Sequence, residues 1–179
     1  MDDLPDVRPA TPDDAAAVQA IYARVVTGSV ASFEETPPSA DEIARRMLAA
    51  PRRPWFAAVR EGVVVGYAYA ATHRARPAYR WSVETSVYLA EPERGRGTGR
   101  ALYVRLLDEL RGLGYVTAFA GVALPNGASV GLHEAVGFQP VGAFRQVGHK
   151  HGAWHDVGWW QLALTPAPAE PSEPRPWTP

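Results

Sequence analysis

Hydrophobic residues recur at two different intervals along the chain. From Thr11, which is followed by a proline and two acidic residues, to Gly28 they recur every three or four positions, which predicts an amphipathic helix. A second helix is predicted to begin at Ser39, where a Ser-x-x-Glu pattern forms a capping box, and to end before Pro51. A short strand around Val7 precedes both. The chain is therefore predicted to begin with a strand followed by two helices.

Beyond Pro51, hydrophobic and polar residues tend to alternate, which is the period of a β-strand. WFAAVR and VVVGYAYAATH flank a Glu61-Gly62 turn and predict a β-hairpin, and WSVETSVYLA predicts the next strand. Helical patterns return twice, first from a glycine-rich loop to Leu113 with Gly114 as the C-terminal cap, then in SVGLHEAVGF. The remaining strands are predicted at YVTAFAGVAL and at roughly 140–149 and 154–164.

This order of elements, β-α-α-β-β-β-α-β-α-β-β, mixes helices with strands that come as hairpins. It predicts a mixed α+β fold in which helices flank a central, twisted, mostly antiparallel sheet, and it disfavours a doubly wound parallel sheet. Residues 1–165 are predicted to form one domain, which fits a chain of 179 residues. Residues 166–179 are rich in proline and are predicted to be a disordered tail.

Composition narrows the classes of function. A net charge of −1 provides no overall field that would attract nucleic acid or an anionic membrane. The absence of cysteine excludes disulfides, thiolate metal ligands and a cysteine nucleophile. MDDLPDVRPA lacks the apolar stretch of a signal peptide, and no apolar run is long enough to span a bilayer. We therefore expect a cytoplasmic enzyme or binding protein with no nucleic-acid or membrane partner.

The glycine- and arginine-rich loop from Arg94 to Gly99 lies between a predicted strand and a predicted helix. Glycines let backbone N–H groups approach one anion, and the helix N-terminus adds the positive end of its dipole. RGRGTG has neither the Gly-Lys-Ser/Thr of a Walker loop nor the spacing of a dinucleotide fingerprint. A folded strand–loop–helix context disfavours an RNA contact. The loop is predicted to bind a pyrophosphate, the alternative being a flexible connection.

The strand before this loop carries a carboxylate near its centre. Ser82, Glu84, Ser86 and Tyr88 share one face of the strand, because successive side chains alternate between faces. A carboxylate flanked by apolar neighbours is costly to bury unless it is paired. Glu84 is therefore either a functional residue or a sheet-face glutamate bonded to a neighbouring arginine, and its place just before an anion loop favours function.

His133 lies three residues from both Val130 and Val136, so it shares an apolar helix face. Without other information, this position indicates a hydrogen-bonded core histidine.

Two further patterns do not predict sites. Gly127-Ala128-Ser129-Val130-Gly131 matches a nucleophile elbow, but no histidine follows Asp156, the acid that a hydrolase triad would need. His149, His151 and His155 lack an obvious fourth ligand for zinc and have a lysine among them, so no metal is predicted.

Together these residues resemble a known family. Arg94-x-x-Gly97-x-Gly99 after a strand resembles the coenzyme A pyrophosphate loop of the GNAT superfamily of N-acetyltransferases, and the order of the elements is similar. More narrowly, the chain resembles the phosphinothricin N-acetyltransferase group over about residues 6–164. The segments that carry this resemblance are SFEETP, AYRW, ETSVY, LPN-x-x-SV-x-LHEA-x-GF and KHGAWHDVGWWQL.

The resemblance implies roles for individual residues. Glu84 would be the general base, and His133 would lie near the thioester as an acid, a hydrogen-bond donor to sulfur or an aid to substrate placement. Many members of the superfamily have a tyrosine at this position, whereas histidine agrees with the phosphinothricin group. The implied cofactor-binding residues are Val87, Tyr88, Leu89, Gly95, Arg96, Gly97, Thr98, Gly99, Arg100 and Asn126. The implied acceptor-binding residues are Phe33, Arg74, Arg76, Tyr79 and Tyr88.

The function implied is transfer of an acetyl group from acetyl-CoA to the α-amine of a small amino-acid-like substrate, such as phosphinothricin, methionine sulfoximine or methionine sulfone. Two alternatives stay open: acetylation of another amine or a protein N-terminus, and a non-catalytic coenzyme A-binding sensor. The resemblance also suggests a homodimer, with the tryptophan-rich C-terminal segment as a plausible contact surface.

Overall fold

The computed structural model describes residues 4–179, and the first three residues of the acidic N-terminal stretch lie outside the described residues. The strands are β1 (Asp6–Pro9), β2 (Trp55–Arg60), β3 (Val63–Thr72), β4 (Ser82–Leu89), β5 (Thr117–Leu124), β6 (Gln139–Lys150) and β7 (Ala153–Ala163). The helices are α1 (Ala15–Gly28), α2 (Ala40–Leu48), α3 (Thr98–Leu113) and α4 (Gly127–Ala135), with short 3₁₀ turns η1 (Pro12–Asp14), η2 (Pro77–Tyr79) and η3 (Glu91–Glu93).

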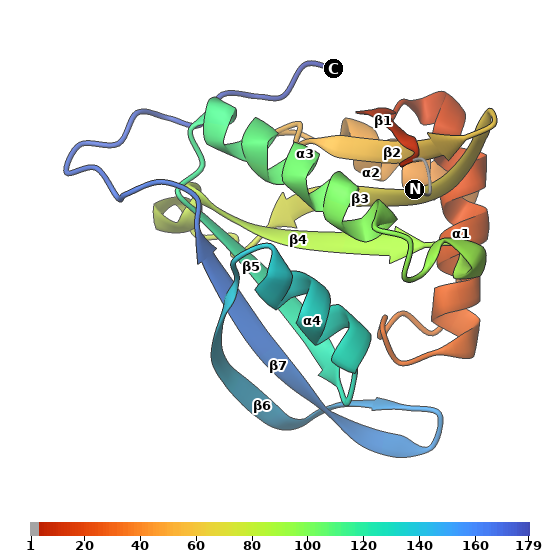
Figure 1. The fold of residues 1–179 in the computed structure, drawn as a ribbon. Coiled ribbons are helices and arrows are strands. Elements are labelled where there is room, and N and C mark those ends of the chain that lie inside the picture. The colour runs from red at the N-terminus through yellow and green to blue at the C-terminus, as the bar shows by residue number, and fades with distance from the viewer. Residues whose placement is uncertain (1–3) are drawn as a thin grey trace.

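The strands form one seven-stranded sheet in the order β1-β2-β3-β4-β5-β7-β6. All neighbours pair antiparallel except β4 and β5. Helices α1 and α2 pack on one face of the sheet, and α3 and α4 lie on the other (Figure 1). This architecture confirms the predicted mixed α+β fold with a mostly antiparallel sheet. Among residues 4–179, no helix has the length and apolar character needed to cross a bilayer.

Local chemistry sets the helix ends. The Ser39 hydroxyl accepts a hydrogen bond from the Glu42 N–H at 3.1 Å, as the capping box predicts. Gly114 closes α3 in the left-handed region at φ 93°, where glycine is favoured. Helix α4 begins earlier than the sequence pattern indicated, because the Asn126 side chain accepts a hydrogen bond from the Ser129 N–H at 3.1 Å and caps the helix.

The core lies between the sheet and its helices. Leu102, Leu106 and Leu110 recur at the helical repeat on α3 and are fully buried, as are Phe56 of β2 and Val83 of β4. Burying each such side chain contributes about 1.5–3 kcal/mol relative to leaving it in water. This packing fixes the strands from which the site is built.

Strands β4 and β5 separate soon after they meet. Their parallel pairing covers Ser82 to Glu84 on β4 and Thr117 to Phe119 on β5. Beyond this point β4 continues beside β3, β5 continues beside β7, and the two strands splay apart (Figure 1). The sheet is therefore split near its centre, and the backbone of β4 has an open edge toward the gap.

The C-terminal tail differs from the disordered segment that its proline content predicts. It forms no helix or strand, but it returns across the C-terminal end of α3 (Figure 1). Trp177 is buried and tilted against Phe56 with ring centroids 5.8 Å apart, and its N–H donates to the Arg52 carbonyl at 2.9 Å. The Trp81 indole N–H also donates to the Ser172 carbonyl at 2.8 Å. The buried aromatic surface of Trp177 stabilises the tail against the domain, which the proline pattern alone does not indicate.

Candidate active site

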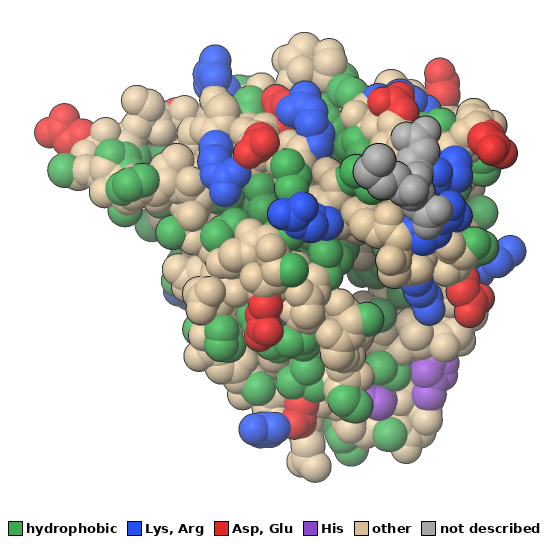
Figure 2. All heavy atoms as spheres, viewed as in Figure 1, with side chains coloured by type: hydrophobic (Ala, Val, Ile, Leu, Met, Phe, Trp, Pro, Cys, Tyr) green, Lys and Arg blue, Asp and Glu red, His purple; other side chains and the backbone are tan. Residues whose placement is uncertain are grey.

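A cavity of about 630 Å³ occupies the split between β4 and β5. Its walls come from both strands, the glycine-rich loop, the starts of α3 and α4, and the end of α1. On the surface, a hollow lies between α3 and α4 with basic side chains on its rim (Figure 2). Most residues expected to bind the cofactor line the cavity, namely Val87, Tyr88, Leu89, Gly95, Gly97, Gly99, Arg100 and Asn126.

The glycine-rich loop can present backbone donors to an anion. Gly97 is the N-cap of α3 at φ 85°, and the first helical bond runs from the Ala101 N–H to the Gly97 carbonyl. The N–H groups of residues 98–100 therefore have no partner within the helix and point beyond its start. A Cβ on Gly99 would lie 3.0 Å from Leu132 Cδ2, so this position leaves little room for a side chain. Loop and helix together form a cradle that suits a pyrophosphate.

A buried carboxylate holds this loop in place. Both oxygens of Glu93 accept hydrogen bonds from Arg60, at 2.9 and 3.2 Å, and the Thr98 hydroxyl donates to it at 2.7 Å. The hydrogen bonds from Arg60 hold the pKa of the Glu93 carboxyl below its usual range, with a further contribution from Thr98. Arg96 also pairs with Glu93, at 3.4 Å. The side chains of Thr98 and Arg96, both expected to bind the cofactor, thus brace the loop and do not line the cavity.

The open edge of β4 offers backbone groups to the cavity. The Ala90 N–H donates to Val65 of β3, whereas the Trp81 carbonyl accepts from Val116 on the β5 side. Because backbone direction alternates along a strand, Val87 and Leu89 direct their N–H and C=O groups toward the gap. Tyr88 faces β3 with its backbone, and its side chain lies on the α1 face of the sheet.

His133 is buried in a closed hydrogen-bond network on the α3–α4 side. Its Nδ1–H donates to the Ser129 carbonyl at 2.7 Å, since a carbonyl can only accept. Its Nε2 lies 2.7 Å from the Tyr103 hydroxyl, which therefore donates to the neutral ring. Burial lowers the pKa of His133, partly offset by the bond to Ser129. His133 touches the cavity, yet both of its ring nitrogens have protein partners. These contacts favour the core histidine indicated by its apolar helix face.

Glu84 lies on the opposite face of β4, toward α1 and α2. Its carboxylate bonds to His73 and not to the arginine that the sequence suggested, with Oε1 3.0 Å from His73 Nδ1. The imidazole of His73 stacks on Phe119 with ring centroids 4.2 Å apart and an interplanar angle of 12°. Because Glu84 Oε2 has no hydrogen-bond partner among residues 4–179 and the side chain is 33% exposed, one oxygen stays accessible. Sequence reasoning did not identify His73.

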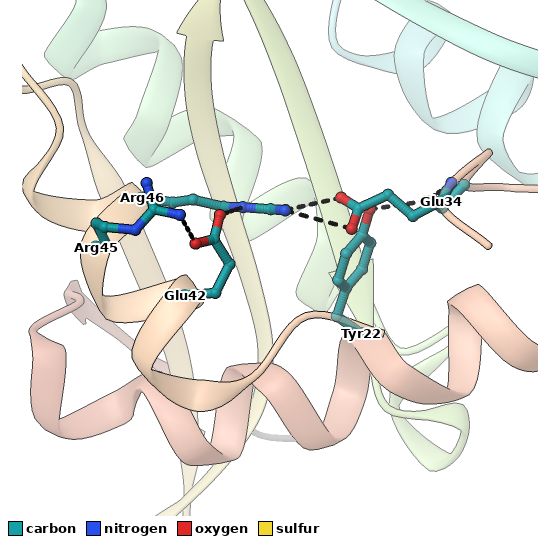
Figure 3. Close-up of polar contacts among 6 residues, drawn as sticks. Tyr22, Glu34, Glu42, Arg45 and Arg46 are labelled. Atoms are coloured by element: carbon teal, nitrogen blue, oxygen red, sulfur yellow. Dashed lines mark hydrogen bonds and ion pairs between the residues drawn. The ribbon is translucent and has the colours of Figure 1, made fainter. Parts of the chain in front are cut away.

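Tyrosines and a polar cluster surround this face. The rings of Tyr22 and Tyr88 lie 5.1 Å apart, and burial raises the pKa of Tyr22 to about 12. Glu34, in the loop after α1, accepts hydrogen bonds from Tyr22 at 3.0 Å and from Arg46 of α2 at 2.7 Å (Figure 3). Burial alone would raise the pKa of Glu34, but the bonds from Arg46 and Tyr22 outweigh it and lower the pKa. The cluster ties the loop after α1 to both helices.

The same loop is also held by the β6–β7 hairpin. The buried Lys150 ammonium donates to the carbonyls of Val26 at 2.6 Å and Ser32 at 2.7 Å. Phe33 lies so close to Gly148 that a Cβ there would be 2.5 Å from its ring. Phe33 therefore packs against β6, outside the cavity lining.

The exposed arginines of the basic loop between β3 and β4 differ in whether they have an ion-pair partner. Arg80 pairs with Glu173 of the tail at 2.7 Å, whereas Arg74 and Arg76 are exposed and have no ion-pair partner within residues 4–179. Tyr79 is also exposed, and its ring meets His73 edge-on at 5.9 Å. Of the five residues expected to bind the acceptor, only Tyr88 lines the cavity. Phe33, Arg74, Arg76 and Tyr79 lie outside it.

The histidines near the β6–β7 turn show no metal-site arrangement. Nowhere in residues 4–179 do three His, Cys, Asp or Glu side chains lie close enough together to hold a metal ion. His155 Nε2 instead donates to the Lys150 carbonyl at 3.0 Å.

Comparison with known proteins gives one consistent result. Residues 7–159 match the family described as acetyltransferase (GNAT) domain. A phosphinothricin N-acetyltransferase of Streptomyces viridochromogenes is 42% identical over 171 residues, covering 94% of this chain and 93% of the relative. An L-methionine sulfoximine/L-methionine sulfone acetyltransferase of Salmonella typhimurium is 35% identical, covering 88% and 94%. Among solved structures, a GNAT superfamily phosphinothricin acetyltransferase of Sinorhizobium meliloti in complex with acetyl-CoA has a TM-score of 0.90 at 37% identity, covering 96% of this chain and 95% of that one.

Proposed function

The chain belongs to the GNAT acetyltransferase family and is an acetyl-CoA-dependent N-acetyltransferase, and from this premise we propose that its acceptor is the α-amine of a small amino-acid-like molecule. Phosphinothricin, methionine sulfoximine and methionine sulfone are the proposed acceptors, by analogy with the named relatives. The observation that carries the proposal is the cavity in the β4–β5 split, which reaches the anion cradle of the glycine-rich loop at one end. Glu84 lies on β4, the strand that forms one wall of this cavity, with its side chain on the α1–α2 face of the sheet.

The residues of the cavity fit acetyl-CoA. The N–H groups at the start of α3 would hold the pyrophosphate, with Gly95 to Arg100 around it, and the open edge at Val87 and Leu89 would pair with the pantetheine arm. Asn126 lies on the opposite wall and would contact the arm near its end. The narrow space at Gly99 supports this assignment, because a side chain there would press on Leu132.

The reaction needs a base, because an α-amino group titrates near ~8 and is mostly ammonium at neutral pH. An ammonium has no lone pair with which to attack a carbonyl carbon. Glu84 would remove its proton, directly or through a water. The amine then attacks the acetyl carbonyl, and backbone N–H groups around Val87 to Leu89 would stabilise the oxyanion. Direct transfer in a ternary complex fits a chain without a cysteine nucleophile.

His133 contributes to this scheme mainly by position. A proton donor to the departing thiolate needs a free N–H, and the only N–H of the neutral ring is bonded to Ser129. Coenzyme A thiolate is a fairly good leaving group and needs little help from an acid. We propose that His133 orients Tyr103 and the start of α4 beside the thioester.

Specificity for an anionic acceptor is proposed to come from the basic loop. Guanidinium groups pair with two oxygens of a carboxylate or phosphinate at once. Arg74 and Arg76 are exposed in the loop that also carries His73, the partner of Glu84, while Arg80 is bonded to the tail. Tyr79, Tyr88 and Phe33 would complete the acceptor site once the loops close on a substrate.

Release of free thiol from acetyl-CoA tests the proposal directly. Amino acids, the three proposed acceptors, other amines and an N-terminal peptide would be compared at equal concentration. We expect the highest kcat/KM for the amino-acid analogues. Preference for another amine or the peptide would favour a different acceptor class. Tight coenzyme A binding without thiol release for any acceptor would favour the sensor.

We also propose a homodimer. Strand β6 forms the edge of the sheet and exposes Val141, Phe144 and Val147, with Trp154 of β7 beside them; each is more than half exposed. A second copy would cover this apolar edge. Light scattering of the purified chain should give twice the monomer mass, and a monomer mass would contradict the proposal. A cytoplasmic location and the absence of nucleic-acid and membrane partners stay predictions.

A further inference from the structure

We propose that the base in this site is a pair, in which Glu84 orients His73 and Nε2 of His73 receives the proton that leaves the acceptor's ammonium group. This inference rests on the proposed function and identifies a residue that neither sequence motif nor resemblance assigned. It is carried by the hydrogen bond of 3.0 Å between Glu84 Oε1 and His73 Nδ1.

The bond to Glu84 sets the tautomer of the ring. A carboxylate can only accept, so the hydrogen between the two atoms lies on Nδ1. In the neutral ring this leaves Nε2 without a proton, and Nε2 has no hydrogen-bond partner among residues 4–179. A carboxylate on one nitrogen and an open lone pair on the other is the arrangement by which an acidic residue makes a histidine a general base.

The surroundings hold the imidazole in one orientation. Phe119 of β5 stacks on its face, while Tyr79 of η2 and Trp159 of β7 meet its edge at 5.9 and 6.3 Å. The side chain of His73 is only 11% exposed. Of these neighbours, Glu84 is the charged group and Tyr79 the other titratable one. An imidazolium would therefore form beside a carboxylate.

Basicity favours the imidazole as the final proton acceptor. An ordinary carboxylate titrates near ~4, whereas an imidazole titrates near ~6.5, closer to the amine and to neutral pH. General bases work best when their pKa lies near the operating pH.

The proton balance is simple. The N–H bond of the acceptor's ammonium breaks, directly or through a water, and its proton forms a new N–H bond at His73 Nε2. The electron pair stays on the amine, which attacks the acetyl carbonyl. The C–S bond then breaks, coenzyme A leaves as the thiolate, and the nitrogen gives up one further proton to solvent to become the amide. Glu84 remains a carboxylate throughout and stabilises the imidazolium, which returns its proton to solvent after product leaves. Glu84 is thus essential as the partner that orients and stabilises His73, which replaces the direct proton uptake by Glu84 in the proposed function.

Two variants separate proton uptake from positioning. His73→Asn places an amide nitrogen where Nδ1 stood and can still donate to Glu84, but it has no basic atom. His73→Phe keeps a ring against Phe119 and loses both nitrogens. Acetyl transfer to saturating methionine sulfone would be measured from pH 6 to 10, with and without added imidazole, and melting curves would check the fold.

We expect kcat to fall about tenfold or more in both variants near pH 7, with the KM for acetyl-CoA unchanged. The acidic limb of the pH profile should flatten, and imidazole should restore part of the rate of His73→Asn. Wild-type kcat and an unchanged pH profile in His73→Asn would overturn the proposal, since a positioning role alone survives that change.

A measurement on the resting wild-type protein does not depend on turnover. Nitrogen NMR of labelled histidine at pH 8 should show His73 protonated at Nδ1 and not at Nε2, with the signal assigned by its loss in either variant. The opposite tautomer would overturn the inference. If the wild-type protein releases no thiol with any acceptor, the proposed function fails instead, and the NMR result still reports on the pair.

Discussion

Two histidines lie on opposite faces of the sheet, and their surroundings differ. His133 is 4% exposed, both of its ring nitrogens are bonded within the protein, and burial lowers its pKa. His73 lies on the α1–α2 face, where the acceptor is proposed to bind. Its Nδ1 is hydrogen-bonded to the Glu84 carboxylate, and its Nε2 has no hydrogen-bond partner among residues 4–179. The comparison teaches that a neutral ring with one open nitrogen can take a proton from a bound molecule without first giving up a hydrogen bond inside the protein.

The same contrast holds for the two faces of β4. The α3–α4 side is built from backbone donors, glycines and a closed network, which suits holding a large cofactor. The α1–α2 side carries Glu84 and tyrosines, and the adjoining loop between β3 and β4 carries exposed arginines, a combination that suits a small charged acceptor. Variants that affect one face and not the other test this division of labour.

The largest effect is expected from Glu84→Gln. The amide keeps the size of the side chain and can still accept from His73, but it has no charge to take up a proton or stabilise an imidazolium. kcat/KM should fall by about 10²-fold or more, and the pH profile should flatten. Glu170→Gln, at an exposed position in the tail, is the matched control. Near-wild-type turnover of Glu84→Gln at pH 7 would show that Glu84 takes no part in deprotonating the acceptor.

An effect on acceptor binding is expected from Arg74→Gln. Loss of one charge-assisted hydrogen bond should raise the KM for the acceptor about tenfold, with the KM for acetyl-CoA unchanged. Arg24→Gln, on the exposed side of α1, removes a similar charge elsewhere. If both arginine variants behave alike, the basic loop does not select the acceptor.

A several-fold effect on the cofactor side is expected from Gly99→Val. Its Cβ would lie 3.0 Å from Leu132 Cδ2 and 3.5 Å from Leu89 Cδ1, so the branched side chain must displace the cavity wall. The KM for acetyl-CoA should rise while the KM for the acceptor stays the same, as steady-state kinetics can show. Gly112→Ala, in open space near the other end of α3, is the control and should bind acetyl-CoA normally.

A smaller catalytic effect is expected from His133→Asn. The new amide can keep the bond to Ser129, while the Tyr103 hydroxyl loses its acceptor, which costs about 1–3 kcal/mol of stability. kcat should stay within about threefold of wild type, because no proton transfer is lost. A large loss of kcat with an unchanged melting temperature would instead make His133 the acid.

The pH dependence of stability gives the last test of His133. Burial lowers its pKa below the usual 6.5, so the unfolded chain binds a proton first as pH falls. The stability that the neutral His133 ring contributes to the folded protein is fully present above about pH 6.5, and it is lost as pH falls toward the folded-state pKa. Melting curves between pH 7 and 5 should show a decline that is smaller in His133→Asn. An equal decline in both proteins would contradict the buried, neutral ring.

Much of this architecture could be predicted from local patterns. The Ser39 N-cap, the Glu61-Gly62 turn and the alternation along β4 act within a few residues, and the structure contains each of them. The glycine loop could be located for the same reason, because Gly95 and Gly97 adopt positive φ in consecutive turns of the backbone, on which its proposed function depends.

Features that depend on distant contacts could not be read in this way. His73 reaches Glu84 only because Thr72 pairs with Val83 across an intervening loop, and the sequence does not state that register. Glu93, in the turn η3, gives no motif, since its partner Arg60 is on β2, 33 residues earlier in the chain. The proline content of the tail predicts disorder because proline disfavours helices and strands. The contact of Trp177 with Phe56 of β2 depends on the tertiary fold, and no local pattern reveals it.

A crystal structure with coenzyme A and methionine sulfone would test the central claim most directly. We predict the pyrophosphate on the backbone amides of Gly95 to Arg100 and the acceptor's amine on the α1–α2 face, within hydrogen-bond reach, directly or through one water, of the Glu84–His73 pair. An amine bound on the α3–α4 side beside His133, away from Glu84, would contradict the account.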